Sequence, residues 1–148
     1  MTVQLIAEFC QNHNGNYDLL AKMVKAAAKS GATYGKMQFI YANTLTFRSE
    51  FEDGLIQNGV IKAIKRPYRA EKKRLKKLEI DEKNTTQFVK LCVDHGLKPI
   101  TTCFVRAHAK AISELGFKSI KIASYDCASF PMLREIKTNF DEEKLINW

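Results

Sequence analysis

The sequence predicts an α/β protein in which parallel strands are joined by helices. Three helical segments end at a glycine that is followed at once by an apolar residue and a predicted strand, at Gly31, Gly96 and Gly116. Glycine ends many helices because it adopts the left-handed backbone readily, and strands separated by such helices pair in parallel through right-handed crossovers. The pattern fits either a doubly wound sheet or part of an eight-stranded (β/α) barrel, and both bind ligands at the carboxyl ends of their strands.

The composition is that of an ordinary globular domain. The chain has 148 residues, of which 45% are hydrophobic and 27% charged, which suffices for one domain with a sizeable core. No apolar run approaches the roughly 20 residues of a membrane span, and the N-terminus lacks a signal-peptide pattern. We therefore expect a cytoplasmic protein with no membrane partner. The cysteines are widely spaced and are expected to be reduced thiols rather than metal ligands. They are Cys10, Cys92, Cys103 and Cys127.

The first predicted unit is a strand, a helix and a second strand. An apolar strand runs from Val3 to Glu8 and gives way to a polar turn. Asn16 is expected to cap the helix that follows. The second strand, at 34–40, carries Lys36 and Gln38 two residues apart, so their side chains share one face.

Glu8 interrupts the apolar pattern of the first strand. Taking an ionised carboxylate out of water costs several kcal/mol, roughly, unless a cation or hydrogen-bond donors meet it. We therefore expect Glu8 to be buried and to have partners on other strands.

The remaining elements follow a long excursion. Residues 41–82 show a weak pattern that we interpret as a basic insertion. The elements expected after it are a helix at 83–95 with Phe88, Val89, Cys92 and Val93 on its buried side, a strand at 97–104, a helix at 107–115, a strand at 117–124 and a helix that begins near Phe130. The last residues, 138–148, do not resemble a fifth strand.

The net charge of +8 is concentrated in one segment. Between Lys62 and Lys77 there are nine basic residues and one acidic residue, Glu71, a balance of 9 − 1 = +8. A basic segment on a periodic helix is usually a solvated face, and no pattern of aromatic residues accompanies it. Nucleic acid is therefore not the expected partner.

Polar side chains recur where the predicted strands end. Because the carboxyl ends of parallel strands meet at one edge of a sheet, we expect these side chains to form one constellation. Its members are Glu8, Lys36, Gln38, Thr101, Thr102, Lys121, Ser124 and Asp126.

The two lysines of this constellation allow two interpretations. Lys36 and Lys121 could be neutralised by Glu8 and Asp126 alone, as a structural arrangement. The functional interpretation is an anionic substrate whose phosphate or carboxylate the lysines bind, with Glu8 as a candidate acid or base. No Gly-rich phosphate loop is present, so a nucleotide is not expected. His13 is expected to be a hydrogen-bonding surface residue more than a substrate contact.

Four segments of the chain resemble the barrel-strand signatures of the sialic acid synthase family. They are IAEFCQNHNG, GKMQF, TTCF and KIASYD, in family order and across nearly the whole chain. In that family the first strand carries the pattern AE-x-x-x-N-H-x-G, which Glu8, Asn12, His13 and Gly15 match. Cys103 stands where the family usually has proline.

The resemblance implies roles for the matched residues. It implies that Glu8 is catalytic. The residues that it implies bind substrate are Lys36, Gln38, Thr102, Lys121, Ser124 and Asp126.

The reaction that the resemblance implies joins phosphoenolpyruvate to an N-acetylated aminohexose. C3 of phosphoenolpyruvate attacks the open-chain aldehyde of the sugar, water attacks C2, and phosphate is lost. In the complete enzyme a divalent metal, manganese or magnesium, polarises the aldehyde and is held by histidines from later strands, so no metal ligand is expected in this chain. The resemblance also implies a homo-oligomer in which a C-terminal antifreeze-like domain closes the partner's site.

The length of the chain limits how much of such an enzyme it holds. A (β/α) barrel needs about 200 residues or more, so residues 1–148 are expected to be the N-terminal half of the barrel domain, about four βα units, without the antifreeze-like domain. Alone, this half is expected to be inactive and to cover its outer strand edges by self-association or with a terminal segment. Two alternatives remain open, namely another phosphoenolpyruvate-dependent aldolase and a non-catalytic half-barrel that binds an anionic sugar or a protein partner.

Overall fold

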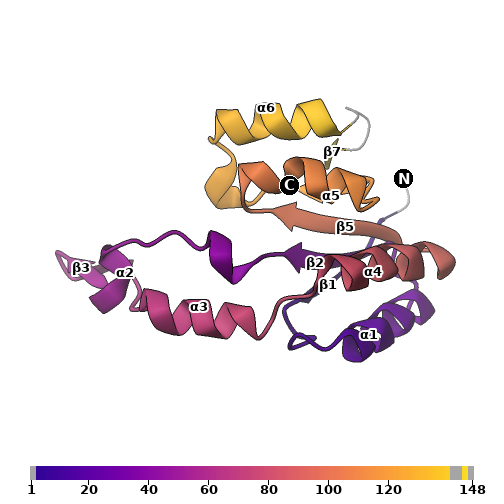
Figure 1. Ribbon diagram of the computed structural model, residues 1–148, viewed down its shortest axis with the longest axis horizontal. Coiled ribbons are helices and arrows are strands. Elements are labelled where there is room, and N and C mark those ends of the chain that lie inside the picture. Colours follow the sequence, from indigo (N-terminus) through magenta and orange to yellow (C-terminus); the bar gives the residue numbers. More distant parts are fainter. Residues whose placement is uncertain (1–2, 141–144, 147–148) are drawn as a thin grey trace. The chain divides into compact units, whose positions relative to one another are not determined.

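The computed structural model describes residues 3–140 and 145–146 (Figure 1). The chain forms two compact units. Unit 1 combines Met1–Phe39 with Ile80–Trp148, and unit 2 is Ile40–Glu79. Unit 2 covers most of the region in which the sequence predicts an insertion.

Unit 1 contains a parallel sheet whose strands follow the order of the chain. Its strands are β1 (Ile6–Cys10), β2 (Tyr34–Phe39), β5 (Lys98–Cys103), β6 (Ser119–Lys121) and β7 (Leu145–Ile146). They lie in the order β1-β2-β5-β6-β7, and every neighbouring pair is parallel. A doubly wound sheet would reverse its strand order at a switch point. This order does not reverse, so of the two predicted architectures it fits the barrel type.

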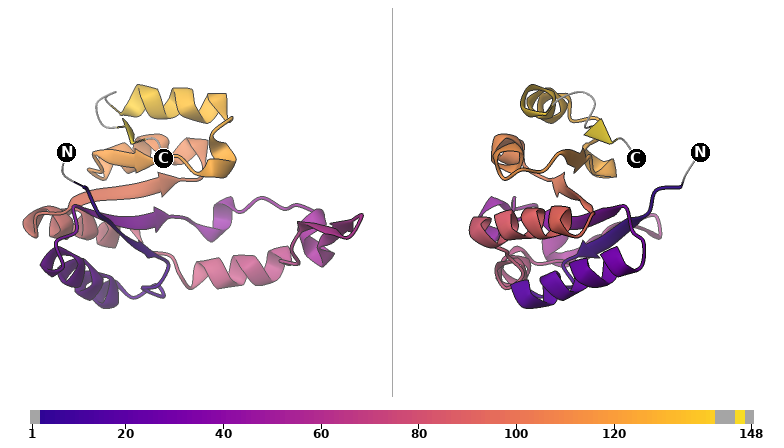
Figure 2. Two further views of the ribbon diagram at one scale, coloured as in Figure 1. Left: turned by 180° about the vertical axis from the view of Figure 1, so that it is seen from behind. Right: turned by 90° about the vertical axis from the view of Figure 1, so that its right-hand side faces the viewer.

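The helices of unit 1 lie along one face of this sheet (Figure 2). They are α1 (Tyr17–Lys29), α4 (Glu82–Asp94), α5 (Ala109–Glu114) and α6 (Phe130–Asn139), with the short 3₁₀ helices η2 (Arg106–His108) and η3 (Ser124–Asp126). Their buried faces meet the sheet through side chains such as Leu20, Phe88 and Ile112, each fully buried. Burial of apolar side chains between helix and sheet is the main stabilising contribution of such a layer.

The predicted helix boundaries of unit 1 are confirmed. Asn16 caps α1, because its side-chain oxygen accepts a hydrogen bond of 3.0 Å from the Leu19 N–H. The three glycines that follow α1, α4 and α5 have φ angles of 81°, 75° and 94°. That left-handed conformation is the reason glycine stands at these helix ends.

Unit 2 contains a hairpin that the sequence analysis does not predict. Its elements are η1 (Ala42–Thr44), α2 (Glu50–Asp53), β3 (Leu55–Gln57), β4 (Val60–Ala63) and α3 (Tyr68–Lys76). β3 and β4 pair in an antiparallel hairpin through Asn58 and Gly59, which have φ angles of 51° and 75°. Two consecutive residues with positive φ suit a tight hairpin turn, and Asn-Gly is a strong sequence signal for it.

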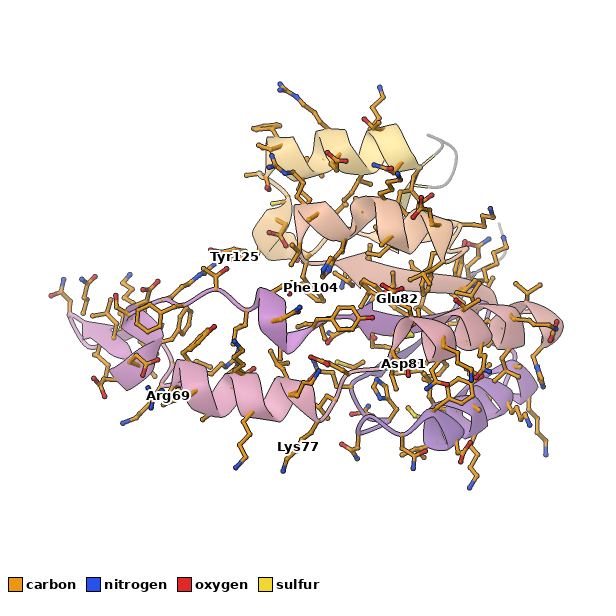
Figure 3. The ribbon with its side chains drawn as sticks, in the orientation of Figure 1. Arg69, Lys77, Asp81, Glu82, Phe104 and Tyr125 are labelled. Carbon is orange, nitrogen blue, oxygen red and sulfur yellow. The ribbon has the colours of Figure 1, made fainter. Side chains whose placement is uncertain are left out.

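The basic segment lies largely on α3. Leu75 is buried on the inner side of this helix, while Arg69 and Lys77 project from it (Figure 3). Three cations of the segment pair with acidic residues of the same unit, Arg74 with Glu71 at 2.7 Å, Lys76 with Glu79 at 2.5 Å and Lys65 with Asp53 at 3.6 Å. The exposed basic residues at 69, 72, 73, 76 and 77 fall three or four apart and share one face, as predicted for a solvated helix.

Four expectations for the secondary structure of unit 1 are wrong in detail. The first strand begins at Ile6 and not at Val3, and both Val3 and Leu5 are exposed. The fourth predicted strand ends at Lys121, and Ser124–Asp126 form η3 instead. Val93 lies on the solvent side of α4 with 61% of its surface exposed. The end of the chain does add a fifth strand, since β7 pairs with β6 in parallel. This two-residue strand is too short to produce a recognisable pattern.

No helix that the structure describes is long and apolar enough to cross a membrane.

Candidate active site

The sheet register places most of the predicted site residues on one face. Glu8 pairs with Lys36, which pairs with Ile100. The next row along the strands pairs Gln38 with Thr102 and Thr102 with Lys121. Paired residues of neighbouring strands, and residues two apart on one strand, point to the same face. Glu8, Lys36, Gln38, Thr102 and Lys121 therefore share the face opposite to the helices.

Glu8 and Lys36 form an ion pair across β1 and β2. Lys36 Nζ donates to Glu8 Oε2 at 2.6 Å, and the side chain of Lys36 is 4% exposed whereas that of Glu8 is 44% exposed. The expectation that Glu8 is a buried carboxylate is thus wrong, because the buried charge is the lysine. The long lysine stem can be covered by apolar neighbours while its ammonium meets a carboxylate at the surface.

A bulge in β1 holds the second oxygen of Glu8. The register shifts between Glu8 and Cys10, and Cys10 has a φ of 51°, unusual for a residue with a side chain. The Cys10 N–H donates to Glu8 Oε1 at 2.9 Å. Both oxygens of this carboxylate are therefore fixed, one by the bulge and one by Lys36.

The row formed by Gln38, Thr102 and Lys121 has side chains that can still form hydrogen bonds. Thr102 is buried, Gln38 and Lys121 are half-buried, and among the described residues their side chains make no hydrogen bond or ion pair. An amide, a hydroxyl and an ammonium in a row supply donors of the kinds that bind an oxyanion. This row is therefore suited to a polar ligand.

Thr101 does not belong to this face. It is fully buried, and its hydroxyl donates to the Met37 carbonyl at 2.9 Å. Thr101 thus joins β5 to β2 on the helix side of the sheet. The expectation that it belongs to the constellation is wrong.

Ser124 and Asp126 lie beyond the end of β6, in η3. Ser124 is exposed and Asp126 half-buried, and the Asp126 N–H donates to the Ala123 carbonyl at 2.8 Å. Tyr125 between them is 75% exposed. These residues are placed by a helical turn at the carboxyl end of β6 rather than by the strand itself.

His13 is buried, not a surface residue as the sequence suggested. It is 1% exposed, and its Nδ1 accepts a hydrogen bond of 3.1 Å from the Gly15 N–H. Burial lowers the pKa of His13 below its ordinary value, opposed by a hydrogen bond with the Cys10 backbone. A neutral His13 therefore anchors the turn after Glu8.

The four cysteines form no disulfide; Cys92 and Cys103 are buried, Cys10 is half-buried and Cys127 is exposed. Burial raises the pKa of Cys92 to about 12 and that of Cys103 to about 11. Such thiols are unreactive near neutral pH because the thiolate is the reactive form.

The residues that the structure describes do not fit the divalent metal of the family reaction. Within 3–140, no three side chains of the His, Cys, Asp and Glu types are grouped so that they could hold an ion. The side chains that this face presents are those of Glu8, Lys36, Gln38, Thr102 and Lys121.

Comparisons with known proteins agree with the motifs. The NeuB family model matches residues 23–146. The chain is 29% identical to the N,N'-diacetyllegionaminic acid synthase of Legionella pneumophila over 134 residues, which are 90% of this chain and 36% of that protein. It is 28% identical to the enzyme of the same name from Campylobacter jejuni over 140 residues, 89% of this chain and 38% of that protein.

Solved structures agree on the fold. The N-acetylneuraminic acid synthetase of Leptospira borgpetersenii, solved with citrate, superposes with a TM-score of 0.72 at 22% identity, over 94% of this chain and 42% of that one. The chain thus spans about two fifths of the length of the proteins it matches. Because the family model covers well over half of the sequence, the resemblance stated above is confirmed, and the chain belongs to the NeuB family.

Proposed function

We propose that the polar face of the unit 1 sheet is part of a nonulosonic acid synthase site that binds phosphoenolpyruvate and an N-acetylated aminohexose. One observation carries the proposal. Gln38, Thr102 and Lys121 form a row of unoccupied donors beside the Lys36–Glu8 pair, on the open face of a sheet whose relatives are synthases of such acids.

In this proposal Lys121 is the principal contact for the anionic groups of phosphoenolpyruvate. It is half-buried, and no described carboxylate pairs with it, so its charge is available to a phosphate or carboxylate. Thr102 and Gln38 are its neighbours in the same row and donate neutral hydrogen bonds. A charge-assisted bond and neutral bonds together fix the orientation of an anion.

The role proposed for Lys36 differs from that of Lys121. Its ammonium already binds Glu8 and is almost fully covered. Lys36 therefore orients the Glu8 carboxyl group, while the exposed side of that group faces the substrates as an acid, a base or a sugar contact. Ser124 and Asp126, at the end of β6, would hold hydroxyl groups of the sugar.

The proposed reaction balances with water as the only further reactant. The C3 atom of phosphoenolpyruvate forms a carbon–carbon bond with the aldehyde carbon of the sugar. Water adds at C2, and the bond from C2 to the phosphate oxygen breaks to release inorganic phosphate. The added water gives up both of its protons as its oxygen becomes the C2 carbonyl oxygen. These two protons balance the one that the aldehyde oxygen takes up as it becomes a hydroxyl and the one that the leaving phosphate takes up.

Two measurements on the 148-residue chain test the proposal. Calorimetric titration should show that the chain binds phosphoenolpyruvate, and should show much weaker binding of pyruvate, which lacks the phosphate. A phosphate-release assay with phosphoenolpyruvate, N-acetylmannosamine and manganese should show no turnover, because the chain covers about two fifths of related proteins.

Three results of these measurements would contradict different parts of the proposal. Equal affinity for pyruvate and phosphoenolpyruvate would exclude a phosphate site at this face. Binding of the sugar with no binding of phosphoenolpyruvate would favour a non-catalytic sugar-binding module. Measurable turnover would refute the inactivity of this chain alone and would support the reaction class.

A further inference from the structure

Two aromatic side chains stand exposed beside the candidate site. Tyr125 is 75% exposed and Phe130 is 66% exposed. Every other aromatic side chain of unit 1 that the structure describes is buried or half-buried. Both exposed rings follow β6, whose last residue is Lys121. Tyr125 lies in η3 and Phe130 begins α6, so both rings belong to the short stretch of chain that follows the carboxyl end of β6.

The backbone fixes where Tyr125 lies. It is the middle residue of η3, between Ser124 and Asp126, and Asp126 and Ser129 extend the turn through backbone hydrogen bonds of 2.8 and 2.9 Å. Figure 3 shows Tyr125 at the same edge of the sheet as Phe104, which directly follows β5. Ligands of parallel βα sheets bind at the carboxyl ends of the strands, so Tyr125 lies at the edge of the sheet where a ligand is expected.

The chemistry of an aromatic ring selects one of the two substrates. The face of a tyrosine ring carries the negative part of its quadrupole, so it disfavours the phosphate and carboxylate of phosphoenolpyruvate. It favours C–H groups with a slight positive charge, which a sugar ring and an acetamido methyl group present. Isolated exposed rings are common, but a pair beside unoccupied polar donors matches the usual composition of a ligand site.

We propose that Tyr125 determines specificity for the acceptor sugar by packing against its N-acetyl methyl group and C–H face, with Phe130 extending the same apolar platform. This inference rests on the proposed function, because it assigns the second substrate of that site. The ligand class is an N-acetylated aminohexose, and Tyr125 is a contact residue rather than an acid or a base.

The test compares two sugars and three variants in the presence of phosphoenolpyruvate. Saturation-transfer NMR on the 148-residue chain should show binding of N-acetylmannosamine and weaker binding of mannose, which lacks the acetamido group. Tyr125→Ser should weaken binding of N-acetylmannosamine roughly three- to tenfold and reduce the preference over mannose. Tyr125→Phe should retain both, since it keeps the ring. Phe47→Ser, which removes a 58% exposed ring of unit 2, should change nothing.

The outcomes separate this inference from the function on which it rests. Tyr125→Ser should leave the affinity for phosphoenolpyruvate unchanged, which also shows that the variant folds. If this variant binds both sugars as the wild type does, the inference is overturned while the phosphoenolpyruvate site stands. If the wild type binds phosphoenolpyruvate but shows no preference for the acetylated sugar, the inference is also overturned. If the wild type binds no phosphoenolpyruvate, the proposed function fails first.

Discussion

The ammonium of Lys36 lies 2.6 Å from the carboxylate of Glu8, and the exposed fractions of the two side chains differ widely, 4% for Lys36 against 44% for Glu8. Lys36 is therefore the buried partner and Glu8 the exposed partner. Removing Glu8 leaves a buried charge without its partner, whereas removing Lys36 leaves a carboxylate that water can solvate. The two residues should respond differently to substitution.

The first prediction concerns this asymmetry. Glu8→Ala should lower the free energy of unfolding by about 1–3 kcal/mol, because Lys36 then stays buried and unpaired. Lys36→Met should change it by less than about 1 kcal/mol. The double variant should be more stable than Glu8→Ala alone. Urea unfolding followed by circular dichroism measures all three, and a larger loss for Lys36→Met than for Glu8→Ala would contradict the argument.

The second prediction concerns Lys121 as the anion contact. Lys121→Met should weaken phosphoenolpyruvate binding by about 1.5–3 kcal/mol, roughly 10- to 150-fold. Lys118→Met is the matched control, because Lys118 is an exposed lysine just before the same strand and should leave the affinity unchanged. Calorimetric titration measures both. Equal losses would show that general positive charge, and not the position of Lys121, attracts the ligand.

The third prediction is a pH dependence that arises from His13. Its folded pKa lies below the ordinary value of 6.5 because of burial, so between those two values the unfolded chain binds more protons than the folded chain. The contribution of His13 to the free energy of unfolding is therefore fully present above about pH 6.5, and it is lost as the pH drops toward the folded pKa. His13→Gln should reduce that loss. Urea unfolding at several pH values, with NMR titration of the imidazole protons, measures this.

His108 limits how much of the pH effect His13→Gln removes. Burial lowers the pKa of His108 as well, opposed by the charge of Glu82, so its contribution has the same sign. In the His13→Gln variant, the pH dependence of the free energy of unfolding should be reduced but not abolished. An NMR pKa for His13 at or above 6.5 would contradict the prediction.

The fourth prediction concerns the packing of Gly35. A Cβ at this position would lie 3.1 Å from Cys92 Sγ and 3.1 Å from Phe9 Cε2. Gly35→Ala should therefore destabilise unit 1 by about 1–3 kcal/mol through overpacking. Adding Cys92→Ala should recover part of the loss, because it removes one of the two close contacts. Thermal unfolding of the single and double variants measures this, and a neutral Gly35→Ala would contradict it.

The fifth prediction concerns the free edge of β1. β1 is the outer strand of the described sheet, and Val3 and Leu5 just before it are 81% and 56% exposed. Such an edge invites pairing with another chain, so the apparent mass in light scattering should rise with concentration. Leu5→Lys should lower it, while Val93→Lys on the exposed side of α4 should not. A monomer at all concentrations would contradict the prediction.

The βα array could be predicted from the sequence because its signals are local. Helix ends at Gly31, Gly96 and Gly116 depend on a backbone conformation that few residues adopt. The common face of Lys36 and Gln38 follows from a spacing of two residues on a strand. The hairpin at Asn58-Gly59 could also have been predicted, since its turn signal is present and β-branched residues flank it.

What the sequence could not predict depends on contacts between distant strands. The burial of Lys36 and the exposure of Glu8 follow from the bulge at Cys10 and from the neighbours of each side chain. The burial of His13 depends on how its turn folds back toward Cys10. The pairing of β7 with β6 is a long-range event that leaves no periodic pattern in two residues.

The insertion of unit 2 between β2 and α4 adds little to the entropic cost of pairing β2 with β5. It lengthens the connection from Phe39 to Lys98 roughly threefold, yet the two strands still pair in register along their whole length. Closing a loop three times longer costs only about 1 kcal/mol in chain entropy. The length of that segment can therefore differ at almost no cost to the sheet that carries Lys36 and Thr102.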